Sequence, residues 1–135
     1  MKVLDTSVLI DIDQNAYPTS IDNLNQDNRL LISSISVFEF WWGICDHYKG
    51  SNLVPEEKEL DFYEFISAYD VVPVTLEVSK LAASFSVQLK QEGKQIDLHD
   101  YYIAATAKIF NTPVVTKNIN HFNRISQITT IEWPI

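Results

Sequence analysis

The sequence predicts an α/β protein with a central, mainly parallel sheet and helices on both faces. Short apolar runs, long enough only for buried strands, alternate with longer amphipathic stretches. The 135 residues include only 3 glycines and 5 prolines, too few for the many tight turns of a sandwich. Strands that alternate with helices pair in parallel, and such a sheet is covered on both faces. A chain of this length forms one domain, residues 1–135.

The first strand is residues 3–4, a short apolar pair that ends at Asp5. Either of the two hydroxyl residues that follow can cap a short helix over residues 8–11. A polar stretch, residues 18–27, contains a further cap, Ser20, and with it another short helix.

The second strand is the apolar run 30–32. Ser36 and Glu39 have the spacing of a capping box, which predicts a helix from Ser36 to about residue 48. A loop follows, and Pro55 suits the first position of a helix that runs through residue 69.

Residues 71–74 form the third strand, after which Thr75 caps an amphipathic helix that Gly93 stops. The apolar positions of this helix recur at the spacing of one helical face. They are Val78, Leu81, Ala82, Phe85 and Leu89.

The last third begins with a helix from about residue 98, rich in small residues that allow close packing on a sheet. The fourth strand is residues 114–116, after Pro113. Residues 118–124 are a loop or short helix, and residues 128–133 are the last strand.

The net charge is −8, which taken alone argues against nucleic-acid binding. The charge is uneven, because residues 1–70 hold 13 of the 18 acidic residues and only 4 of the 10 basic ones. Residues 101–131 contain no carboxylate. We therefore expect any polyanion contact on that side, with Lys117 and Arg124 as the best candidates for phosphate contacts.

No apolar run approaches the roughly 20 residues that span a membrane, so we expect no membrane contact. The first five residues include Asp5, which is not typical of a signal peptide. The single cysteine, Cys45, excludes an internal disulfide and a multi-cysteine zinc site. These features favour a cytoplasmic protein.

Asp5 lies at the carboxyl end of a strand, which is where open parallel sheets form their sites. The alternative is that Asp5 is only a helix N-cap. Glu39 lies on an otherwise apolar helix and needs a partner, because an unpaired buried charge costs several kcal/mol. Its alternative role is the capping box with Ser36.

Asp97 and Asp100 are three residues apart and share one face at a helix start. The alternative for both is a favourable interaction with the positive end of that helix. Small residues after Asp100 bring this helix close to the sheet, which would hold its carboxylate near the strand ends.

Carboxylates gathered at one point raise one another's pKa, and a divalent cation removes that penalty. Mg²⁺ takes one or two carboxylates together with water and phosphate oxygens. Water activated by the ion can then cleave a phosphodiester. We expect four neutral side chains to orient water or phosphate, namely Thr6, Ser7, Thr116 and Asn118.

Four blocks of the chain, in order, resemble the PIN-domain family. They are residues 2–11 (KVLDTSVLID), residues 32–44 with ISSISVFEF and a following Gly-Ile pair, residues 96–107 (IDLHDYYIAATA) and residues 114–122 (VVTKNINHF). They span almost the whole chain. The chain length and the single domain resemble the VapC toxins of type II toxin–antitoxin pairs.

The resemblance implies the PIN fold and a Mg²⁺-dependent endoribonuclease, with Mn²⁺ as a possible replacement. It also implies an RNA substrate, a cognate antitoxin and a homodimer. The acidic positions of the family correspond to Asp5, Glu39 and Asp100, of which Asp5 and Asp100 would be the principal metal ligands. Thr116 and Asn118 correspond to the polar positions after the fourth strand.

The chain departs from the family at one position. Many relatives carry a further Asp immediately before the residue that is Phe122 here, and this chain has His121. The fourth acid is therefore missing unless Asp97 substitutes for it, and His121 could instead contact phosphate. The sequence therefore allows either one or two metal ions at the site.

There are three alternative functions. A receiver domain needs paired acids after the first strand, and a haloacid-dehalogenase-type phosphatase needs two Asp separated by one residue; Asp5-Thr6-Ser7 satisfies neither. A catalytically weak PIN protein that acts as a protein-binding or regulatory module remains the alternative. The net charge and the missing fourth acid favour it, and the three retained acids oppose it.

Overall fold

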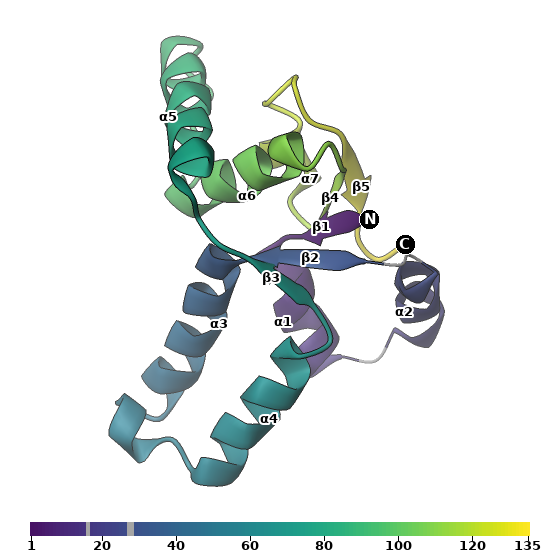
Figure 1. Cartoon of the computed structure of the whole chain (residues 1–135), viewed down its shortest axis with the longest axis vertical. Coiled ribbons are helices and arrows are strands. Elements are labelled where there is room, and N and C mark those ends of the chain that lie inside the picture. The colour runs from purple at the N-terminus through teal and green to yellow at the C-terminus, as the bar shows by residue number, and fades with distance from the viewer. Residues whose placement is uncertain (16, 27–28) are drawn as a thin grey trace.

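The computed structural model describes residues 1–15, 17–26 and 29–135, and its centre is a five-stranded sheet in the order β3-β2-β1-β4-β5 (Figure 1). Every pairing is parallel, which confirms the predicted fold class. The strands are β1 (Lys2–Leu4), β2 (Leu30–Ser33), β3 (Asp70–Val72), β4 (Val114–Thr116) and β5 (Thr130–Glu132). The end of the predicted polar stretch, position 27, lies outside the described residues.

The strand order reverses at β1, because the chain runs outward through β2 to β3 and then returns to the other side of β1 for β4. The carboxyl ends of β1 and β4 therefore flank the switch point, where open parallel sheets bind their ligands.

Helices cover both faces of the sheet (Figure 1). They are α1 (Thr6–Gln14), α2 (Pro18–Asn25), α3 (Ser34–His47), α4 (Glu56–Ile66), α5 (Leu76–Gln91), α6 (Leu98–Ile109) and α7 (Ile119–Phe122). The first four lie on one side and the last three on the other, and α3 and α4 extend beyond the sheet as an antiparallel pair (Figure 1). In the described part of the chain, no helix has the length and apolar character needed to cross a membrane.

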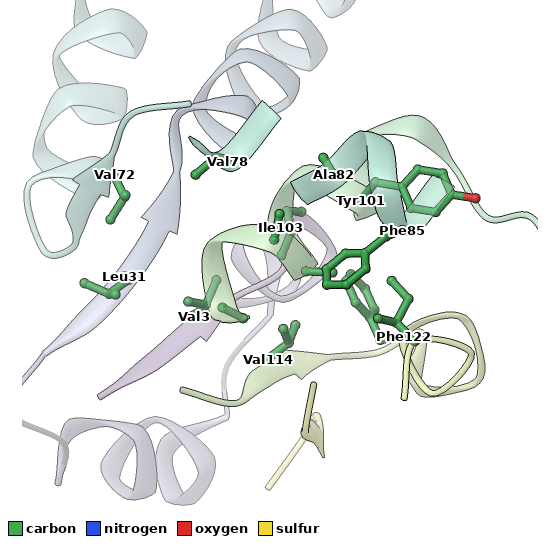
Figure 2. Close-up of a cluster of buried hydrophobic side chains, with 14 of the residues drawn as sticks. Val3, Leu31, Val72, Val78, Ala82, Phe85, Tyr101, Ile103, Val114 and Phe122 are labelled. Atoms are coloured by element: carbon green, nitrogen blue, oxygen red, sulfur yellow. The ribbon is translucent and has the colours of Figure 1, made fainter. Parts of the chain in front are cut away.

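Alternating side chains of the central strands form two cores. Val3, Leu31 and Val114 face α5 and α6, where they pack with residues such as Phe85 and Ile103 (Figure 2). The next residue of each strand faces the other way, onto α1 to α4; these are Leu4, Ile32 and Val115. All six strand side chains are fully buried. Each such side chain contributes roughly 1.5–3 kcal/mol on burial.

The start of α3 differs from the prediction. Its N-cap is Ser33, whose hydroxyl accepts a 3.2 Å hydrogen bond from the Ile35 N–H. Ser36 lies inside the first turn and is fully buried. Glu39 is therefore in the second turn, and the capping box that paired it with Ser36 is wrong. The backbone leaves β2 in extended form up to Ser33, so this earlier hydroxyl takes the capping position.

Other helix boundaries also differ from the prediction. α1 extends over nine residues, and its N-cap position is Asp5 rather than either following hydroxyl residue. Ser20 lies inside α2, where its hydroxyl donates to the carbonyl of Ile135 instead of capping the helix. Pro55 precedes α4, which ends at Ile66. The long-range hydrogen bond of Ser20 is a tertiary contact, which local sequence does not encode.

Both ends of α5 match the prediction. The Thr75 hydroxyl accepts a 3.2 Å hydrogen bond from the Val78 N–H. Gly93 adopts a φ of 68°, the left-handed conformation that ends helices most easily at glycine. The N–H of Lys94 then bonds the carbonyl of Leu89 at 2.8 Å. Capping residues that are visible in the sequence therefore set both ends of α5.

Candidate active site

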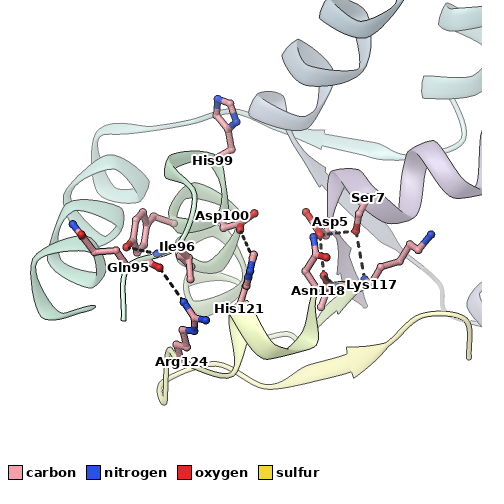
Figure 3. A network of polar contacts seen from close by, with 12 residues as sticks. Asp5, Ser7, Gln95, Ile96, His99, Asp100, Lys117, Asn118, His121 and Arg124 are labelled. Atoms are coloured by element: carbon pink, nitrogen blue, oxygen red, sulfur yellow. Dashed lines mark hydrogen bonds and ion pairs between the residues drawn. The ribbon is translucent and has the colours of Figure 1, made fainter. Parts of the chain in front are cut away.

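Asp5 lies at the carboxyl end of β1 and is only 2% exposed. The Ser7 hydroxyl donates to its Oδ2 at 2.7 Å (Figure 3), and the Thr116 hydroxyl donates to the same oxygen at 2.8 Å. Asp5 occupies the N-cap position of α1, as the alternative interpretation expected, although its side chain makes no standard capping hydrogen bond. Hydrogen bonds with the backbone of Thr6 and Ser7 lower the pKa of its carboxyl group.

Backbone groups orient both hydroxyls toward Asp5. The Asn118 N–H donates to Thr116 Oγ1 at 2.8 Å, and the Lys117 N–H donates to Ser7 Oγ at 3.4 Å. Because each hydroxyl accepts from the backbone, its own proton is free for the carboxylate. Burial raises the pKa of Asp5, while the hydrogen bonds from Ser7 and Thr116 oppose that rise.

Glu39 projects from α3 with 28% of its side chain exposed. The Thr6 hydroxyl donates to its Oε1 at 2.8 Å and lies 2.9 Å from the hydroxyl of buried Ser36. Thr6 follows Asp5 directly, so this contact ties the second acid to the end of β1. Thr6 therefore supplies one of the hydrogen-bond partners that Glu39, an acid on an apolar helix, requires.

The other partner of Glu39 is His99, which no spacing in the sequence links to the site. His99 Nδ1 lies 3.1 Å from Glu39 Oε2, and its ring contacts that of Phe38 at a centroid distance of 6.2 Å. His99 precedes Asp100, which was the only available signal. Its partner is sixty residues away on another helix, so spacing along the chain could not reveal the pair.

Asp100 lies in the first turn of α6 and is 8% exposed. Burial raises its pKa to about 7, and the charges of Asp5, Asp97 and Glu39 contribute to the rise. The position at a helix start favours a charged carboxylate, but burial and repulsion outweigh it. The expectation that carboxylates meet here and disturb one another is therefore confirmed.

Asp97 and His121 extend the acidic group on the side of α7. Asp97 is exposed at the N-cap position of α6 and makes no side-chain capping bond. Ligand atoms of Asp97, Asp100 and His121 all lie within 4.8 Å of one another. His121 Nδ1 is 3.6 Å from Asp100 Oδ2 (Figure 3). This nitrogen is shielded from solvent, and among residues 1–15, 17–26 and 29–135 it has no hydrogen-bond partner.

The two predicted phosphate contacts flank this group and do not enter it. Lys117 Nζ lies 3.3 Å from Oδ1 of buried Asp11, whose Oδ2 accepts from the Trp133 indole at 2.9 Å. Arg124 Nη1 donates to the carbonyl of Gln95 at 3.0 Å on the opposite flank (Figure 3). Both cations are therefore partly engaged within the protein.

This donor set fits a divalent cation. Oxygen ligands from β1, α3 and α6 converge, and their mutual repulsion is the penalty that a cation removes. Nδ1 of His121, 3.6 Å from Asp100 Oδ2, is a further nitrogen at the edge of the group. The charges of Asp5 and Glu39 act on Asp100, whereas Lys117 and Arg124 lie at the periphery; that these three acids bind a metal together stays a prediction.

Comparison with known proteins agrees with this architecture. A family model described as the PIN domain matches residues 2–128. Ribonuclease VapC1 of Methanocaldococcus jannaschii is 33% identical over 125 residues, covering 93% of this chain and 81% of that protein. Ribonuclease VapC of Rickettsia bellii is 30% identical over 134 residues, covering 98% of this chain and 96% of that protein.

A solved structure gives the same result. The crystal structure of DNA-bound VapBC from Salmonella typhimurium contains a chain that matches with a TM-score of 0.83 and 26% identity, covering 98% of this chain and 97% of that one. The family model spans residues 2–128, and the chain aligns with 81% and 96% of the lengths of these two relatives. The chain belongs to the PIN-domain family, in which these relatives are VapC ribonucleases.

Proposed function

We propose that this protein is a Mg²⁺-dependent endoribonuclease, the toxin of a toxin–antitoxin pair. One observation carries the proposal. Asp5, Glu39 and Asp100 come from three separate elements to the carboxyl ends of the parallel strands, close enough that their charges help to raise the pKa of Asp100 to about 7. The names of the VapC ribonuclease relatives support the choice of RNA as substrate.

Asp5 and Asp100 would be the principal ligands of Mg²⁺, with Glu39 completing the set, and Mn²⁺ could replace Mg²⁺. When bound, the ion supplies Lewis-acid stabilisation of the phosphate and a lower pKa for water. The remaining chemistry belongs to side chains of this chain.

Several residues keep these carboxylates in place. Ser7 and Thr116 both donate to Oδ2 of Asp5 and favour its charged form. Thr6 and His99 fix Glu39 between α1 and α6. Asp97, Asn118 and His121 border the same group and support it by contacting water, phosphate or an ion.

RNA would approach along the flanks of the acidic group. Lys117 has 45% of its side chain exposed even though it contacts Asp11, and Arg124 is exposed on the other flank. We propose that both contact RNA phosphates and so offset the repulsion between an acidic protein and a polyanion.

A cognate antitoxin and a second copy of the chain are the proposed protein partners. The VapBC complex that matches this fold supports the antitoxin. On α3, Phe38 and Trp42 are 56% and 58% exposed, which leaves an apolar face for a homodimer. Acting on cellular RNA, the protein would work in the cytoplasm.

The test is cleavage of a labelled, structured RNA by purified protein with Mg²⁺, with Mn²⁺ and with EDTA. Asp100→Asn removes a proposed ligand at nearly constant shape, and Asp46→Asn, at an exposed position on α3, is the matched control. We expect cleavage that requires metal, that is lost in Asp100→Asn and that is retained in Asp46→Asn.

Equal cleavage by wild type and Asp100→Asn would reveal a contaminating nuclease and contradict the proposal. No cleavage of any RNA, together with intact antitoxin binding, would instead favour the catalytically weak PIN protein.

A further inference from the structure

Asp11 is a buried carboxylate that the proposed chemistry does not use. It lies on α1, on the same helix that begins after Asp5, and is only 6% exposed. Its Oδ2 accepts a hydrogen bond from the Trp133 indole at 2.9 Å, and its Oδ1 accepts one from the Asn15 amide at 2.9 Å. The Tyr17 hydroxyl donates to the same carboxylate. Because an ionised carboxylate is costly to bury, this set of donors holds a charge in place inside the protein.

Lys117 supplies the cation that faces this charge. Its Nζ lies 3.3 Å from Asp11 Oδ1, and 45% of its side chain is exposed. The backbone of the same residue lies at the candidate active site, because its N–H donates to Ser7 Oγ at 3.4 Å and the Ser7 hydroxyl donates to Asp5. Figure 3 shows the Lys117 side chain running away from Asp5. The backbone and the charge of this lysine therefore lie on different sides of Ser7.

The direction of the Lys117 side chain matters for cation binding. A lysine ammonium is a compact charge on a flexible four-carbon stem, so it follows the acid that attracts it most strongly. The charges of Asp5 and Glu39 help to raise the pKa of Asp100, and a group of acids with this repulsion attracts any cation. An ammonium that turned toward Asp5 would neutralise part of that charge without the Lewis acidity of a metal ion.

We propose that Asp11 is a positioning residue of the candidate active site, which holds the Lys117 ammonium away from Asp5 and so leaves the carboxylates to the divalent cation. The inference rests on the proposed function only in placing a divalent cation at Asp5. It gives the buried acid of α1 a role that acts through a lysine and involves no contact with the metal. The same ion pair keeps the ammonium on the flank of the site, where RNA is proposed to approach.

The experiment is a double-mutant cycle measured by calorimetric titration of Mg²⁺ into full-length, chelator-treated protein without RNA. Asp11→Asn removes the charge and keeps an oxygen that can accept from Trp133. Lys117→Gln removes the ammonium, and the double variant removes both. Asp13→Asn is the matched control, because it removes an acid at an exposed position of the same helix. Thermal unfolding of each variant shows whether its fold is retained.

We expect Asp11→Asn to bind Mg²⁺ about 10-fold more weakly than wild type, as for loss of a residue that orients a metal site. Lys117→Gln alone and the double variant should both bind within about two-fold of wild type, because without the ammonium Asp11 has no competing cation to hold. Asp13→Asn should bind like wild type.

An additive cycle would overturn the inference. If Lys117→Gln strengthened Mg²⁺ binding as much as Asp11→Asn weakened it, the two charges would act independently through their long-range fields. Weak binding that persisted in the double variant, or loss of the fold in Asp11→Asn, would assign Asp11 a structural role and would also contradict the inference.

The outcome for Asp11 is separable from that for the proposed function. Metal-dependent RNA cleavage by wild type, with unchanged Mg²⁺ affinity in Asp11→Asn, would refute the positioning role and leave the nuclease intact. The expected cycle of Mg²⁺ affinities without cleavage of any RNA would support the positioning role and count against the nuclease.

Discussion

The Thr116 hydroxyl donates a 2.8 Å hydrogen bond to Asp5 across 111 residues of sequence. The pairing of β1 with β4 sets Leu4 opposite Val115, so the next residue of each strand meets at the carboxyl edge of the sheet. The Asn118 N–H binds the same hydroxyl and fixes the direction of its proton. The sheet register thus places a hydrogen bond that opposes the rise in pKa that burial causes at Asp5, the most buried acid in the site.

Replacing Thr116 with Val should impair the site without disrupting the fold. The variant is similar in shape and removes a charge-assisted hydrogen bond, so the pKa of metal-free Asp5 should rise further. We expect kcat/KM for RNA cleavage to fall about 10- to 100-fold, as for loss of a residue that orients a metal ligand. Cleavage rates over a Mg²⁺ titration measure the change.

Thr129→Val is the control, because Thr129 is exposed and precedes β5. Unchanged activity in Thr116→Val, or an equal loss in both variants, would show that this hydroxyl does not act through Asp5.

Local signals predicted the strands that matter and left the polar partners unspecified. The apolar pair before Asp5 and the run before Thr116 were visible in the sequence, and their parallel pairing brings both residues to one edge. The hydrogen bond from Thr116 to Asp5 depends on the register of β1 with β4, which cannot be read from the sequence. The link between His99 and Glu39 depends on how α6 packs near α3, and no periodicity encodes that packing.

Metal-free protein should become less stable as pH rises. The pKa of Asp100 is raised to about 7 in the folded chain, against 3.8 for an unperturbed carboxyl group. Between these values the folded state binds more protons than the unfolded state, so the free energy of unfolding falls with rising pH. Above pH 7 the full penalty is present, and below about pH 4 it is absent.

Asp100→Asn removes the titrating group and should therefore stabilise the metal-free protein at high pH. We expect Tm at pH 8 to exceed that of wild type by about 5 °C, allowing for solvent screening, with no gain at pH 4. Thermal unfolding in EDTA at both pH values measures this, with Asp46→Asn as control. A gain of equal size at the two pH values would mean that repulsion at Asp100 is not its cause.

We expect Lys117 and Arg124 to contribute to the salt dependence of RNA affinity. Arg124→Gln and Lys117→Gln should each reduce the slope of log affinity against log salt by about 0.7, the contribution of one contact to single-stranded nucleic acid. RNA binding by a cleavage-deficient Asp100→Asn background over a range of salt concentrations measures the slope. Lys80→Gln, at an exposed position on α5, is the control.

Lys117→Gln should also lower stability, because it removes the cation 3.3 Å from buried Asp11. Because the Lys117 side chain is 45% exposed, solvent screening should keep this loss of stability small. An unchanged salt slope combined with lower stability would assign Lys117 a purely structural role at Asp11.

The exposed face of α3 should hold two copies of the chain together. Phe38 and Trp42 are one helical turn apart and both more than half exposed, whereas Trp41 packs against Phe62 at a ring distance of 4.9 Å. Trp42→Lys places a charge on this face and removes an aromatic anchor of the type that contributes about 2 kcal/mol or more at an interface. Sedimentation equilibrium should therefore show the dimer dissociation constant rising by about 30-fold or more. Val87→Lys makes the same change at a residue 55% exposed on α5, across the sheet, and should leave the dimer intact. A monomeric wild type, or equal weakening by the two variants, would rule out this face as the interface.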